Sequence, residues 1–256
     1  MIEATAVQLV SAGVYAVSAV VFLVLTRRKP AELRRYCYPF IAVLIAGTIG
    51  AGLSGTETGM IPVLDGALDV GQLVSDYAAY PFLFGFAAFI AGASRRYIGA
   101  VVGVTVLMRA GYDVAELFDG TLGLVGLVAI VGGYLTLVGL YFGPISAAAA
   151  RQPPARELFY TKTRNLVLFT FGVLIVWAIL QLFGLLDPFT GTVTLEYLEF
   201  LLRVGFAGFV FANVAELVTT DDTDGGAGGA DNDADGVDGD ADGGPRSGVA
   251  TAPGAD

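Results

Sequence analysis

The sequence contains no histidine and a single cysteine, Cys37. The absence of histidine excludes a Ser-His-Asp or Cys-His nucleophile pair, and it excludes zinc and iron sites with histidine ligands. A single cysteine excludes an intramolecular disulfide. We therefore expect a protein that is not an enzyme and that holds no metal, although chemistry based on carboxylates alone is left open.

Charged residues are also scarce. They make up 15% of the 256 residues, whereas 55% are hydrophobic; a typical soluble domain has about a quarter charged residues. The hydrophobic residues form long unbroken runs, and about 20 such residues cross the bilayer core as a helix. The runs predict an all-α membrane protein, a bundle of seven transmembrane helices. The predicted spans are about 5–26, 36–54, 74–93, 97–117, 121–143, 166–184 and 194–217.

The basic residues are confined to alternate loops. Five lie in the first loop, two in the third and four in the fifth, out of 14 in the chain, and the even-numbered loops contain none. The positive-inside rule places the odd loops in the cytoplasm. We therefore expect a multi-pass protein of the cell membrane with its N-terminus outside and its C-terminus inside. The second loop, 55–75, is either a short hairpin around Met60–Val63 or an irregular loop.

The last residues differ in composition from the rest. Residues 219–256 are rich in Asp, Gly and Ala, and such a segment buries too little apolar surface to offset its conformational entropy. We expect a membrane domain at 1–218 and a disordered acidic cytoplasmic tail at 219–256. The tail is either a solubilising segment or a docking segment. The preference for Asp over Lys is typical of a halophile.

Charged residues inside the predicted spans are candidate functional groups, because ionisable groups are costly at bilayer depth. Glu199 and Arg203 are four residues apart in the seventh span, a spacing that favours an ion pair on one helix face. The pair is either part of an ion or proton path, a switchable lock, or a static link. Arg109 and Asp113 repeat this spacing in the fourth span, either as a local pair or, with Asp76 about one turn into the third span, as a polar cluster open to the outside.

Several segments resemble the microbial rhodopsins, the family that includes bacteriorhodopsin. The segment Arg203-Val204-Gly205-Phe206 is similar to the Lys-Val-Gly-Phe segment of the family's last helix, and Glu199 matches a carboxylate four residues earlier. The segment Arg164–Val167 matches the family's entry to the sixth helix, and weaker similarity covers Met60–Pro62 and Tyr141–Gly143. The resemblance extends over about residues 5–217 and implies the rhodopsin-like fold, with a trimer or another homo-oligomer as the expected assembly.

The resemblance also implies that the retinal site is altered. The position of the lysine that binds retinal as a Schiff base is Arg203, and a guanidinium forms no stable Schiff base because its nitrogens are delocalised and protonated. The counterion region of the third helix corresponds to Asp76, Tyr77, Ala79 and Tyr80, with Asp76 at an arginine position and Ala79 at the aspartate position. The aromatic positions of the sixth helix correspond to Phe171, Leu174 and Ile175, with Trp177 nearby. Phe171, Leu174 and Trp177 are the expected lining of a possible pocket.

These departures predict an opsin-related protein of a halophilic archaeon that lacks the Schiff-base lysine. Its expected role is regulatory, sensory or scaffolding, without photochemistry and without covalent retinal. The alternatives are a light-driven ion transporter or photoreceptor with retinal or a carotenoid held non-covalently, and a passive ion path. The lipid bilayer is the expected environment, and nucleic acid is not an expected partner. The sequence does not identify a protein partner.

Overall fold

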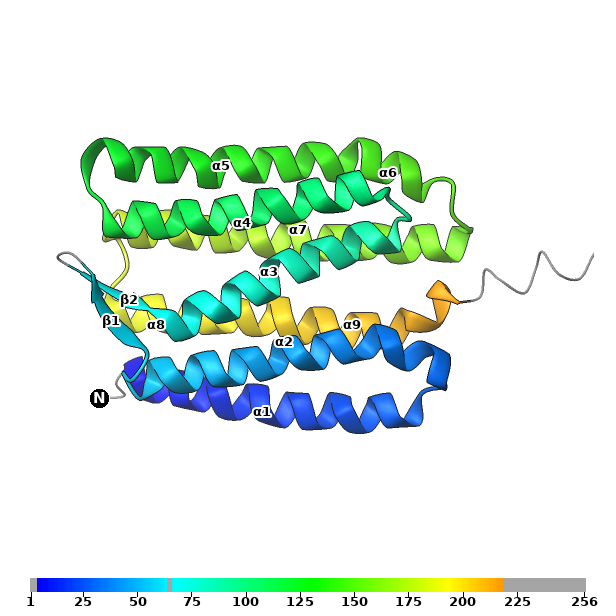
Figure 1. Ribbon diagram of the computed structural model, residues 1–256, viewed down its shortest axis with the longest axis horizontal. Helices are drawn as coiled ribbons and strands as arrows, with labels where there is room; N and C mark the ends of the chain where they lie inside the picture. Colours follow the sequence, from blue (N-terminus) through cyan, green and yellow to red (C-terminus); the bar gives the residue numbers. More distant parts are fainter. Residues whose placement is uncertain (1–3, 64–65, 219–256) are drawn as a thin grey trace, which may run out of the picture.

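The computed structural model describes residues 4–63 and 66–218, and within these residues the chain forms a bundle of long helices with one hairpin. Seven apolar spans lie along a common direction (Figure 1). The helices are α1 (Ala4–Arg28), α2 (Ala31–Gly55), α3 (Val70–Ile90), α4 (Arg95–Leu117), α5 (Gly120–Phe142), α6 (Pro144–Ala149), α7 (Pro154–Leu182), α8 (Pro188–Phe200), the π-helical turn η1 (Leu201–Gly205), α9 (Phe206–Asn213) and the 3-10 turn η2 (Val214–Leu217). The predicted fold class is confirmed.

Strands β1 (Met60–Val63) and β2 (Gly66–Asp69) pair antiparallel between α2 and α3, so the hairpin alternative is the one that the structure adopts. The hairpin lies at the end of the bundle where α1 begins, which we call the hairpin end (Figure 1). The last described residues of η2 lie at the opposite end, which we call the tail end. Residues 219–256, predicted to be a disordered tail, lie outside the described residues.

Each predicted span falls on one observed span, but several helices begin earlier than predicted. The largest difference is α7, which begins at Pro154 instead of about 166. Its first turns carry Arg156, Lys162 and Arg164. The spans were predicted from hydropathy, which indicates contact with lipid rather than helical conformation, so the polar turns at the start of this helix were not included. Similarly, α3 begins at Val70, which places Asp76 nearly two turns inside the helix rather than one.

Glycines allow two pairs of helices to approach closely. A side chain at Gly50 of α2 would lie 2.7 Å from the carbonyl oxygen of Gly71 in α3, and one at Gly126 of α5 would collide with the carbonyl oxygen of Gly111 in α4. These contacts bring backbones together without side chains between them, as in many membrane helix pairs. The first contact holds α3 against α2 near the hairpin end, where α3 carries the polar residues of the candidate site.

The surface of the bundle is apolar and its interior contains a small number of charges. Large hydrophobic side chains such as Val10, Val17, Val128 and Leu135 are more than 60% exposed, which is the expected face toward lipid. In contrast, the buried charged residues in the described part of the chain are Asp76, Arg109, Glu199 and Arg203.

Candidate functional site

Arg203 lies at the centre of the bundle, in the π-helical turn η1 between α8 and α9. Its exposed fraction is 2%. A π-helical turn inside an α-helical span inserts one extra residue per turn and often occurs at functional positions, because it changes the direction of a side chain. Gly47 of α2 makes room for the guanidinium, since a side chain there would lie 3.1 Å from Arg203 Nη1.

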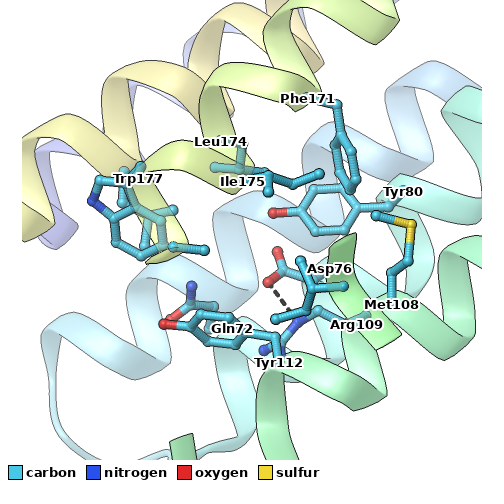
Figure 2. Close-up of a pocket in the computed structure, with 13 residues that line it drawn as sticks. Gln72, Asp76, Tyr80, Met108, Arg109, Tyr112, Phe171, Leu174, Ile175 and Trp177 are labelled. Carbon is cyan, nitrogen blue, oxygen red and sulfur yellow. Dashed lines mark hydrogen bonds and ion pairs between the residues drawn. The ribbon is translucent and has the colours of Figure 1, made fainter. Parts of the chain in front are cut away.

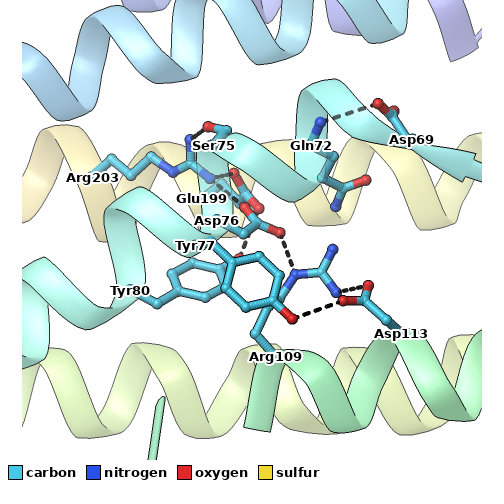
Figure 3. Close-up of polar contacts among 10 residues, drawn as sticks. All are labelled: Asp69, Gln72, Ser75, Asp76, Tyr77, Tyr80, Arg109, Asp113, Glu199 and Arg203. Carbon is cyan, nitrogen blue, oxygen red and sulfur yellow. Dashed lines mark hydrogen bonds and ion pairs between the residues drawn. The ribbon is translucent and has the colours of Figure 1, made fainter. Parts of the chain in front are cut away.

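The guanidinium of Arg203 joins two helices through three polar contacts. Nη2 lies 2.5 Å from Glu199 Oε2 on its own helix and 2.6 Å from Asp76 Oδ1 on α3. Nη1 donates a hydrogen bond to Ser75 Oγ, also on α3. The predicted Glu199–Arg203 pair is therefore present, and Asp76 is a second carboxylate on the same cation (Figure 3).

Asp76 extends the network from Arg203 to α4. Its Oδ2 accepts a hydrogen bond from Arg109 Nε at 3.0 Å, and Arg109 Nη1 contacts Asp113 on the same helix. Tyr77 donates its hydroxyl to Asp113 Oδ2 at 3.1 Å. Of the two expectations for Arg109 and Asp113, a local pair or a cluster with Asp76, the structure has the contacts of the cluster. Asp76 also connects this cluster to Arg203, so that all these residues form one network (Figure 3).

The charges of this network alternate in sign along its length. From Glu199 the order is carboxylate, Arg203, Asp76, Arg109 and Asp113, so each guanidinium lies between two carboxylates. Tyr80 completes the arrangement, because its hydroxyl donates to Glu199 Oε1 at 2.9 Å. Burial of charge is costly, and pairs with close geometry and further hydrogen bonds recover much of that cost. The network therefore fixes α3, α4 and α8 relative to one another.

The structure and the family resemblance differ in which residue of α3 supplies the carboxylate near Arg203. The resemblance places an arginine position at Asp76 and the counterion position at Ala79. The carboxylate that reaches Arg203 from α3 is that of Asp76, whereas Ala79 is fully buried and supplies no polar group. Ser75 as a hydrogen-bond acceptor of Arg203 was missed by sequence reasoning. The one available signal was its position as a polar residue next to Asp76 near the start of a helix.

A small polar cavity lies beside Arg203 on the hairpin side. It is lined by residues of α1, α2, α3 and α8, including Tyr15, Gln72, Glu196 and Glu199, and it has about 20 Å³ of room for the centres of water-sized molecules. Tyr15 Oη and Arg203 Nε are buried without a hydrogen-bond partner among the described residues. Such atoms are costly unless water satisfies them, and this volume is enough for about one water molecule. Sequence reasoning missed Tyr15 and Glu196.

A second cavity is lined by residues of α3, α4, α5, α7 and α8 (Figure 2). The three residues predicted from the sixth helix, Phe171, Leu174 and Trp177, all line it, as do Tyr80 and Met108. The Trp177 ring nitrogen donates to the carbonyl oxygen of Gly191 at 3.0 Å. The cavity has about 50 Å³ of room for the centres of water-sized molecules, whereas pockets for drug-sized ligands measure about 300–1,000 Å³.

The residues present do not fit covalent retinal. The chain has two lysines, Lys29 and Lys162; Lys29 follows the end of α1 and Lys162 lies near the start of α7, so both are at the tail end. The nitrogen-bearing side chains that line the two cavities are those of arginine, glutamine and tryptophan, and none of these condenses with an aldehyde as a lysine amine does. Among the described residues, no group of three carboxylates or thiols is placed to hold a metal ion.

The layer next to the network on the tail side is apolar. Phe206 and Ala207 follow Arg203 along its own span, and Leu83 and Phe84 follow Tyr80 on α3. All four are at most 1% exposed. The buried charges therefore have polar surroundings toward the hairpin end and a packed hydrophobic layer toward the tail end.

Comparisons with known proteins bear on the fold. No family model and no curated protein sequence matches this chain. Among solved structures, a light-driven proton pump rhodopsin of Coccomyxa subellipsoidea has 15% identity and a TM-score of 0.75, over 82% of this chain and 96% of that chain. Thermophilic rhodopsin from Rubrobacter xylanophilus has 17% identity and a TM-score of 0.74, over 84% and 97%.

A light-driven proton pump from Leptosphaeria maculans has 12% identity and a TM-score of 0.76, over 85% of this chain and 97% of that chain. The likeness covers the seven-span domain rather than a single helical hairpin, and the sequence resemblance around Arg203 led to the same family independently. This chain therefore has the seven-helix membrane fold of the microbial rhodopsins.

Proposed function

We propose that this protein is an opsin-related member of the microbial rhodopsin family that works without a covalently bound chromophore, in a regulatory, sensory or scaffolding role in the cell membrane. Arg203, at the position that the resemblance assigns to the lysine, carries this proposal. Its guanidinium is a permanent cation that contacts Ser75, Asp76 and Glu199. It takes the place of a protonated Schiff base as the positive charge beside a carboxylate, without the reactive amine.

The neighbouring residues support a structural role for this charge. A photochemical site needs a chromophore that moves against its counterion, whereas here the cation is part of the chain and lies between two carboxylates within 2.6 Å. The network connects α3, α4 and α8, and both oxygens of Asp76 and of Glu199 are engaged by its other members. We infer that this buried network stabilises one arrangement of the bundle.

Two observations weigh against the alternatives. A passive ion path needs polar groups on both sides of the centre, and the layer on the tail side is apolar. A non-covalent retinal or carotenoid is favoured by the aromatic residues Phe171 and Trp177 around the second cavity, but that cavity has about 50 Å³ of room. A chromophore therefore requires large side-chain movements, and we rank this reading second.

An absorption spectrum of the purified protein with added all-trans retinal tests the proposal. We expect the wild-type protein to show no new visible band, because no amine is available in the bundle. Arg203→Lys restores an amine next to Glu199, and Arg109→Lys is the matched control, because it introduces an amine into the same network at another helix. A visible band in the wild type contradicts the proposal. A band in Arg203→Lys alone shows that the site retains the family geometry.

A further inference from the structure

An open groove runs along the outside of the bundle between α1 and α8. It is lined by Val10, Ser11, Val14, Tyr15, Glu196, Tyr197 and Phe200, and it has about 260 Å³ of room for the centres of water-sized molecules. Val10 is 67% exposed and Tyr197 is 64% exposed. The groove therefore opens toward the hydrocarbon region rather than into the bundle.

Within the described part of the chain, Glu196 is the one charged side chain that lines this groove. It lies eight residues after the start of α8, which corresponds to about 12 Å along the helix. Among the described residues it has a hydrogen-bonding contact with Ser11 and takes part in no ion pair. A carboxylate in a lipid-facing groove is costly unless a cation accompanies it.

The internal cation Arg203 acts on Glu196 through its charge but forms no ion pair with it. Glu196 and Tyr15 line both the groove and the polar cavity beside Arg203, so they separate the two spaces. Arg203 Nη2 is already held by Asp76 and Glu199. The charge on the groove side is therefore left for a cation that comes from the membrane.

The other groove residues suit a cation that carries an apolar body. Tyr197 and Phe200 offer aromatic faces, which attract ammonium groups, and Val10 and Val14 provide an aliphatic wall. Charge complementarity with Glu196 selects a positive head group, and the apolar lining selects an alkyl chain. We propose that this groove binds a cationic amphiphile from the bilayer, with its ammonium group against Glu196 and its chain along α1.

Calorimetric titration of decyltrimethylammonium into the full-length protein tests this proposal. The protein is held in uncharged dodecylmaltoside micelles, and protein-free micelles give the background. We expect saturable binding at one site per chain, weakened at least about tenfold in Glu196→Gln because the charge pair is lost. Glu116→Gln, which removes a carboxylate from α4 outside the groove, is the matched control and leaves the affinity unchanged.

Two further measurements separate the groove from general effects. Decanol, which has the chain without the charge, is expected to show equal affinity for the wild type and Glu196→Gln. Val14→Trp fills the groove without removing a charge and abolishes the saturable binding, so it tests the proposal even where Glu196→Gln is unstable. Non-saturable uptake by the wild type, or equal affinity for the wild type and Val14→Trp, overturns the proposal.

Discussion

The guanidinium of Arg203 differs chemically from the lysine amine that the family resemblance assigns to this position. A lysine offers one compact charge and a nitrogen that reacts with aldehydes, whereas arginine offers a planar set of donors and stays protonated. Arg203 divides these donors between Ser75, Asp76 and Glu199. Its burial depends on these acceptors, because an isolated charge at this depth is unfavourable.

Removal of the cation is expected to cost more than removal of the whole pair. Arg203→Gln leaves Glu199 buried without its cation, and we expect the free energy of unfolding to fall by about 3–5 kcal/mol. The double variant Glu199→Gln/Arg203→Gln removes both charges and is expected to recover more than half of that loss. Titration with SDS in mixed micelles measures both values.

The single variant Glu199→Gln completes a double-mutant cycle with Arg203→Gln and the double variant. Arg203 keeps Asp76 as a partner in that variant, so its loss is expected to be smaller than that of Arg203→Gln. Additive effects of the two substitutions would contradict a direct energetic coupling between Glu199 and Arg203.

At the scale of helices, the site depends on how closely α2 and α3 approach. Gly50→Ala places a methyl group 2.7 Å from the carbonyl oxygen of Gly71, and we expect a loss of about 1–3 kcal/mol from overpacking. Gly52→Ala is the matched control, because nothing lies within 4 Å of its new methyl group. It is expected to stabilise the helix by about 0.5–1 kcal/mol. Equal effects of the two variants would contradict the close contact.

The start of α8 gives a prediction with a pH dependence. Asp187 accepts a hydrogen bond from the backbone of Thr190 at 3.0 Å, and hydrogen bonds from Thr190 lower the pKa of this carboxyl. A lowered pKa in the folded state means that this stabilisation is present above the ordinary aspartate pKa and is lost as the pH falls through the folded value.

The variant Asp187→Ala is therefore expected to lower the unfolding midpoint at neutral pH, and this decrease is expected to be smaller in acid. Asp119→Ala at the start of α5 is the control, because Asp119 makes no side-chain capping bond. Unfolding midpoints measured across acid and neutral pH check both variants. A decrease in the midpoint of Asp187→Ala that is equally large in acid and at neutral pH would contradict the capping role of Asp187.

The helices could be predicted well from the sequence, and the site only in part. Uninterrupted apolar runs locate spans such as α5 because the bilayer fixes their length. The spacing of Glu199 and Arg203 predicted their pair because both residues lie on one helix. A cluster of Asp76 with Arg109 and Asp113 was one of the expected alternatives. The link from Asp76 to Arg203 was not predictable, because it depends on the packing of α3 against α8 and on the π-helical turn at Arg203, which no local pattern indicates.

At the scale of the whole molecule, the distribution of charge separates the two ends of the bundle. The basic loops lie at the tail end, and the hairpin end carries acidic residues such as Glu57 and Asp119. This asymmetry predicts that the hairpin end faces the outside. In this predicted orientation, the polar surroundings of the buried network face the outside and its apolar layer faces the cytoplasm.

Cysteine labelling of intact cells tests this orientation. Cys37 is fully buried, and Cys37→Ser provides a background without thiols. We expect a membrane-impermeant maleimide to label Thr58→Cys, in the exposed turn before β1, in intact cells. Arg151→Cys, at the opposite end, is expected to react only after the membrane is permeabilised. The reverse pattern would contradict the orientation.

The most direct test of the central claim, that the interior of this bundle offers no amine to an aldehyde, is borohydride trapping. The wild-type protein is incubated with retinal, freed of excess retinal, and then treated with sodium borohydride, which reduces any Schiff base to a stable amine. It is then digested and analysed by mass spectrometry. We predict that no peptide from the membrane interior gains a retinyl group. A retinyl adduct on a peptide that contains Arg203 would contradict the account.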